Sequence, residues 1–200
     1  MFNSQQERDS AVRRAGLQVL RSACGVLALS AIAYSVAPRP NSMGRIYLIT
    51  LLTMLKFYSY ITAIEAGYRL HLAYYHIRAP KCFDEPWESK SVQEFWGSRW
   101  NLSIAQQLRN LLFKPLASRG YRKAGLLNMF LGSATLHILP VQQLGGNGRM
   151  MASTGVFFLL QPVLIAMERQ FPNICTGRAW VQLALWGVAP LFALPVYHLM

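Results

Sequence analysis

Acidic residues are scarce in this chain of 200 residues: eight Asp and Glu stand against twenty Lys and Arg, and charged residues make up 14% of the total. A soluble domain carries about a quarter of charged residues, so the deficit indicates a membrane protein. A net charge of +12 could suggest nucleic-acid binding. The basic residues lie between apolar stretches, however, where they set membrane topology, and this argues against a nucleic-acid partner.

Residues typical of metal or cofactor sites are also few. The three cysteines, Cys24, Cys82 and Cys175, are far apart and fit neither a disulfide framework nor a zinc site. The sequence has no glycine-rich phosphate loop, no Ser-His-Asp order, no paired-carboxylate pattern and no internal repeat. We therefore expect no metal and no bound cofactor.

Long apolar stretches account for much of the 53% hydrophobic content. Five are long enough to cross a bilayer as helices: 16–37, 46–65, 124–141, 150–167 and 179–199. The second helix is expected to continue towards His76, and turns are expected at 38–41 and 145–148. The pattern predicts an all-α fold, a multi-pass transmembrane helical bundle of about five spans.

The polar parts divide the chain into a cytoplasmic N-terminal segment, 1–15, and a membrane domain, 16–200, with a long loop at 77–123. Within the loop, residues 103–118 place apolar side chains at helical spacing, which is typical of an interfacial amphipathic helix. Pro115 is expected to kink or end that helix. Fourteen basic residues fall on the side of the loop and N-terminus and three on the other, which predicts a cytosolic N-terminus.

His137 is an ionisable residue inside the third apolar stretch. Such a residue is costly at membrane depth and is therefore a candidate functional residue. A neutral imidazole can take a proton from a hydroxyl group near neutral pH. The small residues at 132–135 would let a substrate or a helix approach closely. A structural histidine bonded to a neighbouring helix is the other interpretation, and the residue alone does not decide between them.

Asn101 is the second candidate, because an amide can donate to a developing oxyanion or orient a thioester carbonyl. Taken alone, it is more typical of a helix N-cap, since it directly precedes the amphipathic segment. Trp96, Arg99 and Trp100 could form an aromatic and cationic wall beside a polar ligand, or belong to an interfacial aromatic belt. These residues are our candidates for substrate binding in the loop.

Lys56 is a second intramembrane charge and a further candidate for substrate binding. It would line a polar cavity or pair with a carboxylate such as Glu168.

The block Ser91–Asn101 (SVQEFWGSRWN) resembles the tryptophan-rich string of the wax synthase-like branch of the membrane-bound O-acyltransferase superfamily. The lead-in Lys81–Pro86 and the string Phe130–His137 (FLGSATLH) are similar to other parts of that pattern, and Glu168 also fits. The resemblance covers roughly residues 45–200. One departure is Ser98, where the family often has an arginine.

The resemblance implies an enzyme of the endoplasmic reticulum, embedded in membrane lipid. It would move an acyl or acetyl group from acyl-CoA or acetyl-CoA, used as co-substrate, to the hydroxyl of a lipophilic alcohol, a sterol or a terpenoid secondary metabolite. It further implies His137 as the base and Asn101 as its polar partner at the active centre.

Members of the branch usually have about twice as many spans. An inactive or partial membrane subunit, with a partner chain that supplies N-terminal spans, is therefore the alternative. A membrane-bound terpene cyclase is the third hypothesis. It needs acidic residues within the membrane, and only Glu65 and Glu168 lie near spans.

Overall fold

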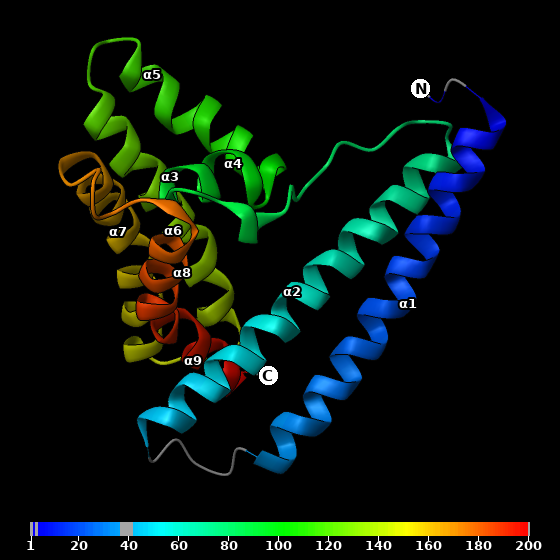
Figure 1. Cartoon of the computed structure of the whole chain (residues 1–200), viewed down its shortest axis with the longest axis horizontal. Coiled ribbons are helices and arrows are strands. Elements are labelled where there is room, and N and C mark those ends of the chain that lie inside the picture. Colours follow the sequence, from blue (N-terminus) through cyan, green and yellow to red (C-terminus); the bar gives the residue numbers. More distant parts are fainter. Residues whose placement is uncertain (1, 3, 37–41, 200) are drawn as a thin grey trace. The chain divides into compact units, whose positions relative to one another are not determined.

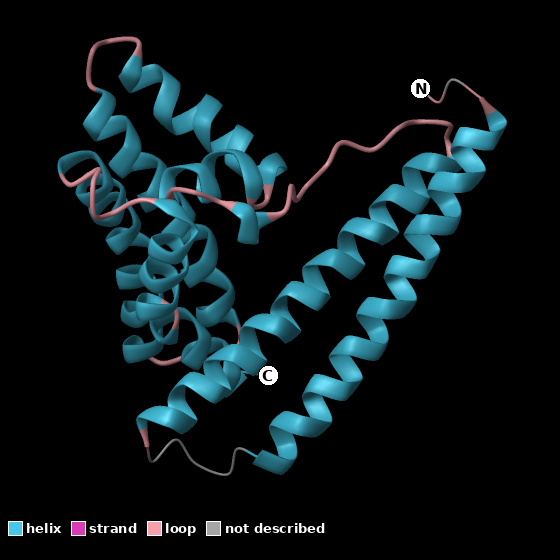
Figure 2. Ribbon diagram, in the orientation of Figure 1, coloured by secondary structure: helices cyan, strands magenta, loops and turns pink. Residues whose placement is uncertain are grey.

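The computed structural model describes residues 2, 4–36 and 42–199, and within these ranges it consists of helices and turns without a strand (Figure 2). The turn expected at 38–41 and the last residue of the first predicted span lie outside the described residues. The chain divides into two compact units, Met1–Pro80 and Lys81–Met200.

The first unit is a pair of long helices, α1 (Gln5–Val36) and α2 (Met43–Tyr74), which lie side by side (Figure 1). The buried hydroxyl groups of Ser22 and Thr62 form a hydrogen bond of 3.0 Å between them, which satisfies both polar groups inside the apolar contact. Polar residues 5–15 are the first turns of the same helix as the first predicted span. The predicted continuation of the second helix beyond residue 65 is confirmed.

Four described helices are long and apolar enough to cross a membrane: α1, α2, α6 (Arg122–Gln143) and α7 (Gly148–Gln170). A fifth crossing is possible if α8 (Gly177–Val188) and α9 (Pro190–Leu199), which meet at an angle of 49°, form one span. The predicted fold class, an all-α multi-pass membrane protein, is confirmed. The fifth predicted span is bent rather than continuous, because the Pro190 ring and its missing N–H interrupt the helix.

The second unit is built around the hairpin of α6 and α7, with α9 packed against α7. The predicted turn between the hairpin helices is confirmed. Gly145 adopts a φ of 83° there, and the Asn147 side chain accepts a hydrogen bond of 3.0 Å from the Met150 N–H to begin α7. Phe158 and Ile165 are among the fully buried side chains of this unit and lie on α7.

The segment expected as a loop at 77–123 contains several short helices. They are η1 (Pro86–Glu88), α3 (Val92–Glu94), the π-helical turns η2 (Phe95–Arg99) and η3 (Arg109–Phe113), α4 (Leu102–Leu108) and α5 (Lys114–Ala117). The predicted helix at 103–118 is therefore confirmed, with a wide turn directly before Pro115. Proline cannot donate to the carbonyl four residues earlier and its ring displaces that carbonyl, which accounts for the widening.

Two glycines of α6 let this helical loop pack closely against it. A Cβ atom at Gly125 would lie only 2.9 Å from the backbone oxygen of Phe113, and one at Gly132 would clash with the Leu112 side chain. The contact between α6 and η3 thus leaves no room for a side chain at Gly125, whereas at Gly132 the Leu112 side chain would have to move. It fixes the loop relative to the helix that carries His137.

Candidate active site

The tryptophan-rich block is a compact turn of backbone rather than an extended loop. The Ser91 hydroxyl accepts a hydrogen bond of 2.9 Å from the Glu94 N–H and begins α3. The π-helical turn η2 follows, closed by a hydrogen bond of 2.9 Å from the Trp100 N–H to the Phe95 carbonyl. This turn stacks the Phe95 and Trp100 rings, with centroids 5.4 Å apart and planes inclined by 15°.

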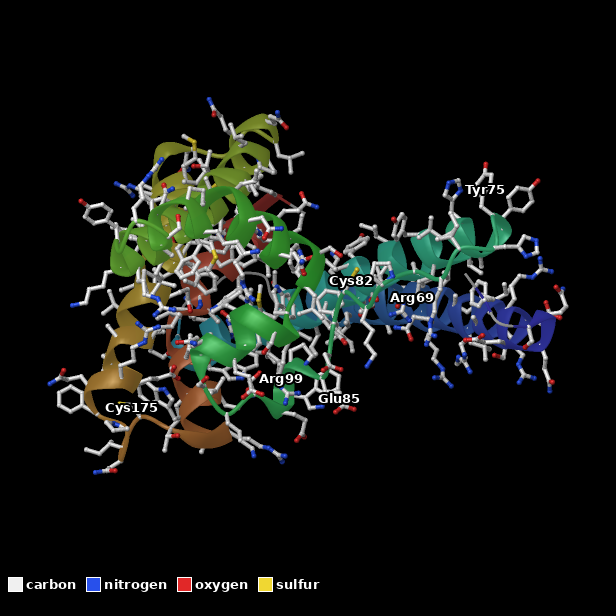
Figure 3. The ribbon with its side chains drawn as sticks, turned by 90° about the horizontal axis from the view of Figure 1, so that it is seen from above. Arg69, Tyr75, Cys82, Glu85, Arg99 and Cys175 are labelled. Carbon is white, nitrogen blue, oxygen red and sulfur yellow. The ribbon has the colours of Figure 1, made fainter. Side chains whose placement is uncertain are left out.

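The Arg99 side chain braces this turn from within the loop (Figure 3). Its Nε donates to a Glu94 carboxylate oxygen at 2.7 Å, and its Nη1 donates to the backbone oxygens of Asp84 and Glu85 at 3.1 and 3.3 Å. The pKa of Glu94 is lowered, mainly by the hydrogen bond that its carboxylate accepts from the Lys90 N–H and secondly by Arg99. The hydrogen bond to Glu94 in turn raises the pKa of Arg99. The predicted contact of Arg99 with a substrate stays a prediction.

Trp96 points from the loop into the helical core. Its indole N–H donates to the Gln161 side-chain oxygen at 3.0 Å, and Gln161 is fully buried on α7. The Gln161 amide nitrogen in turn donates to the Phe157 carbonyl at 2.8 Å. Phe130 and Phe158 surround the indole, with ring centroids 6.3 and 6.2 Å away. The polar edge of Trp96 is therefore paired while its faces are packed among aromatic rings.

His137 lies on α6 with its ring held in place from two sides. Its Nδ1 is 2.7 Å from the Ser133 carbonyl oxygen, and its ring centroid lies 4.3 Å from that of Phe158 and 5.6 Å from that of Phe192. A carbonyl oxygen can only accept, so we assign the ring proton to Nδ1. In the neutral ring, Nε2 then keeps its lone pair and can accept a proton.

One aromatic cluster joins the predicted site residues. Phe158 contacts both His137 and Trp96, and the Trp96 ring lies 6.5 Å from that of Trp100, the residue before Asn101. Ring contacts thus link His137, Trp96 and Trp100 through Phe158 within the second unit, and Asn101 follows Trp100 in the chain. The remaining predicted residue, Lys56, lies on α2 in the first unit.

Asn101 occupies the N-cap position of α4 in an unusual conformation. Its φ of 45° and ψ of 58° are left-handed, and its side chain makes no capping hydrogen bond within the described structure. Hydrogen bonds fix the backbone on both sides: Asp84 N–H to Arg99 O at 2.9 Å and Leu102 N–H to Cys82 O at 2.8 Å. Asn101 thus lies at the N-cap position, as predicted, but its side-chain amide does not cap the helix.

Two polar residues of α7 that hold the loop were not identified as site residues from the sequence. Gln161 pairs with Trp96, and Glu168 accepts hydrogen bonds from the Val92 N–H at 2.6 Å and the Trp180 indole at 2.9 Å. Gln161 could have been recognised from the sequence, because it is a polar residue inside an apolar stretch. It stands seven residues, about two helical turns, before Glu168 and so on the same face of the helix.

No three His, Cys, Asp or Glu side chains within the described ranges are grouped so that they could hold a metal ion. The chemistry that the cluster offers is proton acceptance at His137 Nε2, beside the rings of Phe158 and Phe192.

The sequence model of the Membrane bound O-acyl transferase family matches residues 79–160, which include the tryptophan-rich block and His137. A diacylglycerol O-acyltransferase 1B of Glycine max is 29% identical over 117 residues, 56% of this chain. Two proteins of Arabidopsis thaliana named as long-chain-alcohol O-fatty-acyltransferases, putative number 10 and probable number 8, are 31% and 32% identical over 43% and 44% of the chain.

The matched parts are 23% of the length of the soybean protein and 28% of that of each Arabidopsis protein. The chain thus spans less than a third of these relatives. No solved structure matches it.

Proposed function

Because the chain belongs to the membrane bound O-acyl transferase superfamily, we propose that it transfers an acyl group from acyl-CoA to the hydroxyl of a lipophilic alcohol. The relatives named after a long-chain alcohol and diacylglycerol support an acceptor that reaches the site from the membrane. The observation that carries the proposal is the oriented His137, whose Nδ1–H donates to Ser133 and whose Nε2 is left to accept a proton.

His137 Nε2 takes the proton of the acceptor hydroxyl as the hydroxyl oxygen attacks the thioester carbonyl carbon. The carbon–sulfur bond then breaks, and the thiolate of coenzyme A leaves and receives the proton from the imidazolium. The bond to the Ser133 carbonyl holds the ring through both proton transfers. The neighbouring Phe158 and Phe192 exclude water, which would otherwise compete with the alcohol.

Asn101 serves as the polar partner of His137. Its left-handed backbone is fixed by hydrogen bonds on both sides, and its amide is not used to cap α4. An amide N–H placed at the thioester oxygen would stabilise the negative charge that develops on that oxygen. Trp96 and Trp100 would form the wall of the acyl site, and Arg99 would bind the polar part of a substrate.

The chain is an integral membrane protein. We propose that it resides in the endoplasmic reticulum, with the N-terminus and the tryptophan-rich loop on the cytosolic side. The excess of Lys and Arg on that side supports the orientation. Acyl-CoA would then approach from the cytosol and the alcohol from the bilayer. Acetyl-CoA as the donor and a terpenoid secondary metabolite as the acceptor are the finer proposal, which rests on the resemblance of the block Ser91–Asn101.

The second proposal is a membrane subunit without activity of its own. The matched parts make up less than a third of each relative, so activity of this chain in isolation is the point that the experiment below tests.

Microsomes from yeast expressing the chain decide between the two proposals. Labelled acetyl-CoA and longer acyl-CoAs would be offered with mixed lipophilic alcohols to wild type, His137→Ala and the control His198→Ala, whose side chain is exposed on α9. Ester formation that is lost in His137→Ala and kept in His198→Ala supports the transferase. Full activity in His137→Ala contradicts it, and no ester from a well-expressed wild type favours the subunit.

A further inference from the structure

We propose that Glu168 is a positioning residue, which holds the start of α3 on α7 and thereby sets the place of Trp96 and Asn101 in the site. The catalytic part of this inference rests on the proposed acyl transfer, whereas its structural part does not. Glu168 lies near the end of α7, and none of its hydrogen-bond partners named below belongs to the aromatic cluster.

The Glu168 carboxylate accepts three hydrogen bonds from two different elements. One oxygen accepts from the Val92 N–H at 2.6 Å and from the Trp180 indole N–H at 2.9 Å, and the other accepts from the Gln93 N–H at 3.3 Å. Val92 and Gln93 are the first two residues of α3, so their N–H groups have no acceptor within the helix. Glu168 therefore satisfies groups that α3 cannot satisfy by itself.

Together with Gln161, Glu168 attaches the loop to α7 at two points. The two residues are seven positions, or about two turns, apart and share a face of the helix. Glu168 holds the first residues of α3, and Gln161 holds Trp96 in the π-helical turn that follows without interruption. A shift of α3 would accordingly move Trp96, and with it the residues up to Asn101.

Two further side-chain contacts between the loop and this end of the molecule are exposed. Arg169 donates to the Gln93 side chain at 2.8 Å, and Arg178 forms an ion pair with Glu88. Exposed ion pairs contribute little because water and salt screen them. The partly buried hydrogen bond from Val92 to Glu168 is therefore the stronger restraint, and Arg169 provides a matched control at the next position of the chain.

The test compares Glu168→Gln with Arg169→Ala in the full chain, reconstituted in lipid nanodiscs. Glutamine keeps one acceptor oxygen but turns an NH₂ group towards N–H donors, so at least one hydrogen bond is lost with little change of volume. We expect amide hydrogen exchange to rise at residues 90–101 in Glu168→Gln, while exchange in α6 and α7 stays at the wild-type rate. Arg169→Ala should leave both regions unchanged.

Acyl transfer provides the second readout. For a residue that places the site, we expect kcat to fall about tenfold in Glu168→Gln with KM for acyl-CoA within about twofold of wild type. Wild-type exchange at 90–101, or faster exchange spread evenly over the second unit, would overturn the positioning role. If the wild type itself makes no ester, the proposed transfer fails, and the exchange comparison still decides whether Glu168 holds the loop.

Discussion

The indole N–H of Trp96 donates to the side-chain oxygen of Gln161 at 3.0 Å, across 65 residues of sequence. Gln161 is fully buried and is itself tied to the Phe157 carbonyl. This hydrogen bond lies next to Phe158, whose ring also contacts His137. It connects the tryptophan-rich loop directly to the hairpin of α6 and α7.

Removing the acceptor of this bond should cost stability. Gln161→Leu leaves the Trp96 N–H unpaired among aromatic rings, and we expect the free energy of unfolding to fall by about 1–3 kcal/mol. Unfolding in mixed micelles measures the change. In a Trp96→Phe background the same substitution should cost clearly less, because no indole N–H remains to be satisfied. Equal costs in the two backgrounds would show that the hydrogen bond contributes nothing.

Two substitutions of Asn101 distinguish the role of its left-handed backbone in stability from the role of its amide in catalysis. Glycine adopts a φ of 45° without strain, so we expect Asn101→Gly to be as stable as wild type, and Asn101→Ala to lose about 1–2 kcal/mol. Both should lower kcat by about 100-fold if the amide stabilises the oxyanion. Thermal unfolding and ester formation in microsomes measure the two effects. An active Asn101→Gly enzyme would remove Asn101 from the mechanism.

Ser153 compensates for a proline in α9. Its hydroxyl donates to the Leu191 carbonyl at 2.7 Å, and the residue four positions after Leu191 is Pro195, which has no N–H to donate. We expect Ser153→Ala to cost about 0.5–1.5 kcal/mol. In a Pro195→Ala background the helix can supply its own donor, so Ser153→Ala should become nearly neutral. A double-mutant cycle measured by unfolding in micelles would show no coupling if this explanation is wrong.

The Glu94 carboxylate makes the loop sensitive to acid. Its pKa is lowered by the Lys90 N–H and by Arg99, so its contribution to stability is complete above the ordinary carboxyl pKa and is lost as pH falls through the lowered value. We expect amide exchange at residues 90–100, corrected for its intrinsic pH dependence, to increase below the ordinary carboxyl range. Glu94→Gln should show the weaker protection at every pH. A wild-type loop with constant protection down to strongly acidic pH would contradict the assignment.

Local sequence was sufficient for the long helices and for the turn between α6 and α7, but not for the bend in the last predicted span. The apolar stretches predicted α2, α6 and α7 to within a few residues at most ends, because length and hydropathy are properties of the stretch itself. The sequence does not predict the bend before Pro190, because a proline alone does not show whether a helix breaks. Pro140 and Pro162 lie inside α6 and α7 without ending those helices. Packing decides which proline breaks a helix and which is accommodated.

The predicted site residues divide in the same way. His137 and Trp96 could be recognised from their type and surroundings, and the structure places both at Phe158. Arg99 was predicted as part of a wall beside a ligand, whereas its hydrogen bonds go to its own loop, at Glu94 and at the Asp84 carbonyl. Sequence gives the charge of a side chain but not the acceptors that the folded backbone brings to it.

By itself, the sequence determined that this is a helical membrane protein with a basic, tryptophan-rich loop and a histidine inside an apolar stretch. Composition and hydropathy suffice for that, because the bilayer admits few other structures. Only the tertiary structure decided that Gln161 pairs with Trp96 and that Glu168 holds Val92, residues 65 and 76 positions apart. Such pairs form where separate helices meet, and no periodic pattern along the chain encodes which donors and acceptors will face each other.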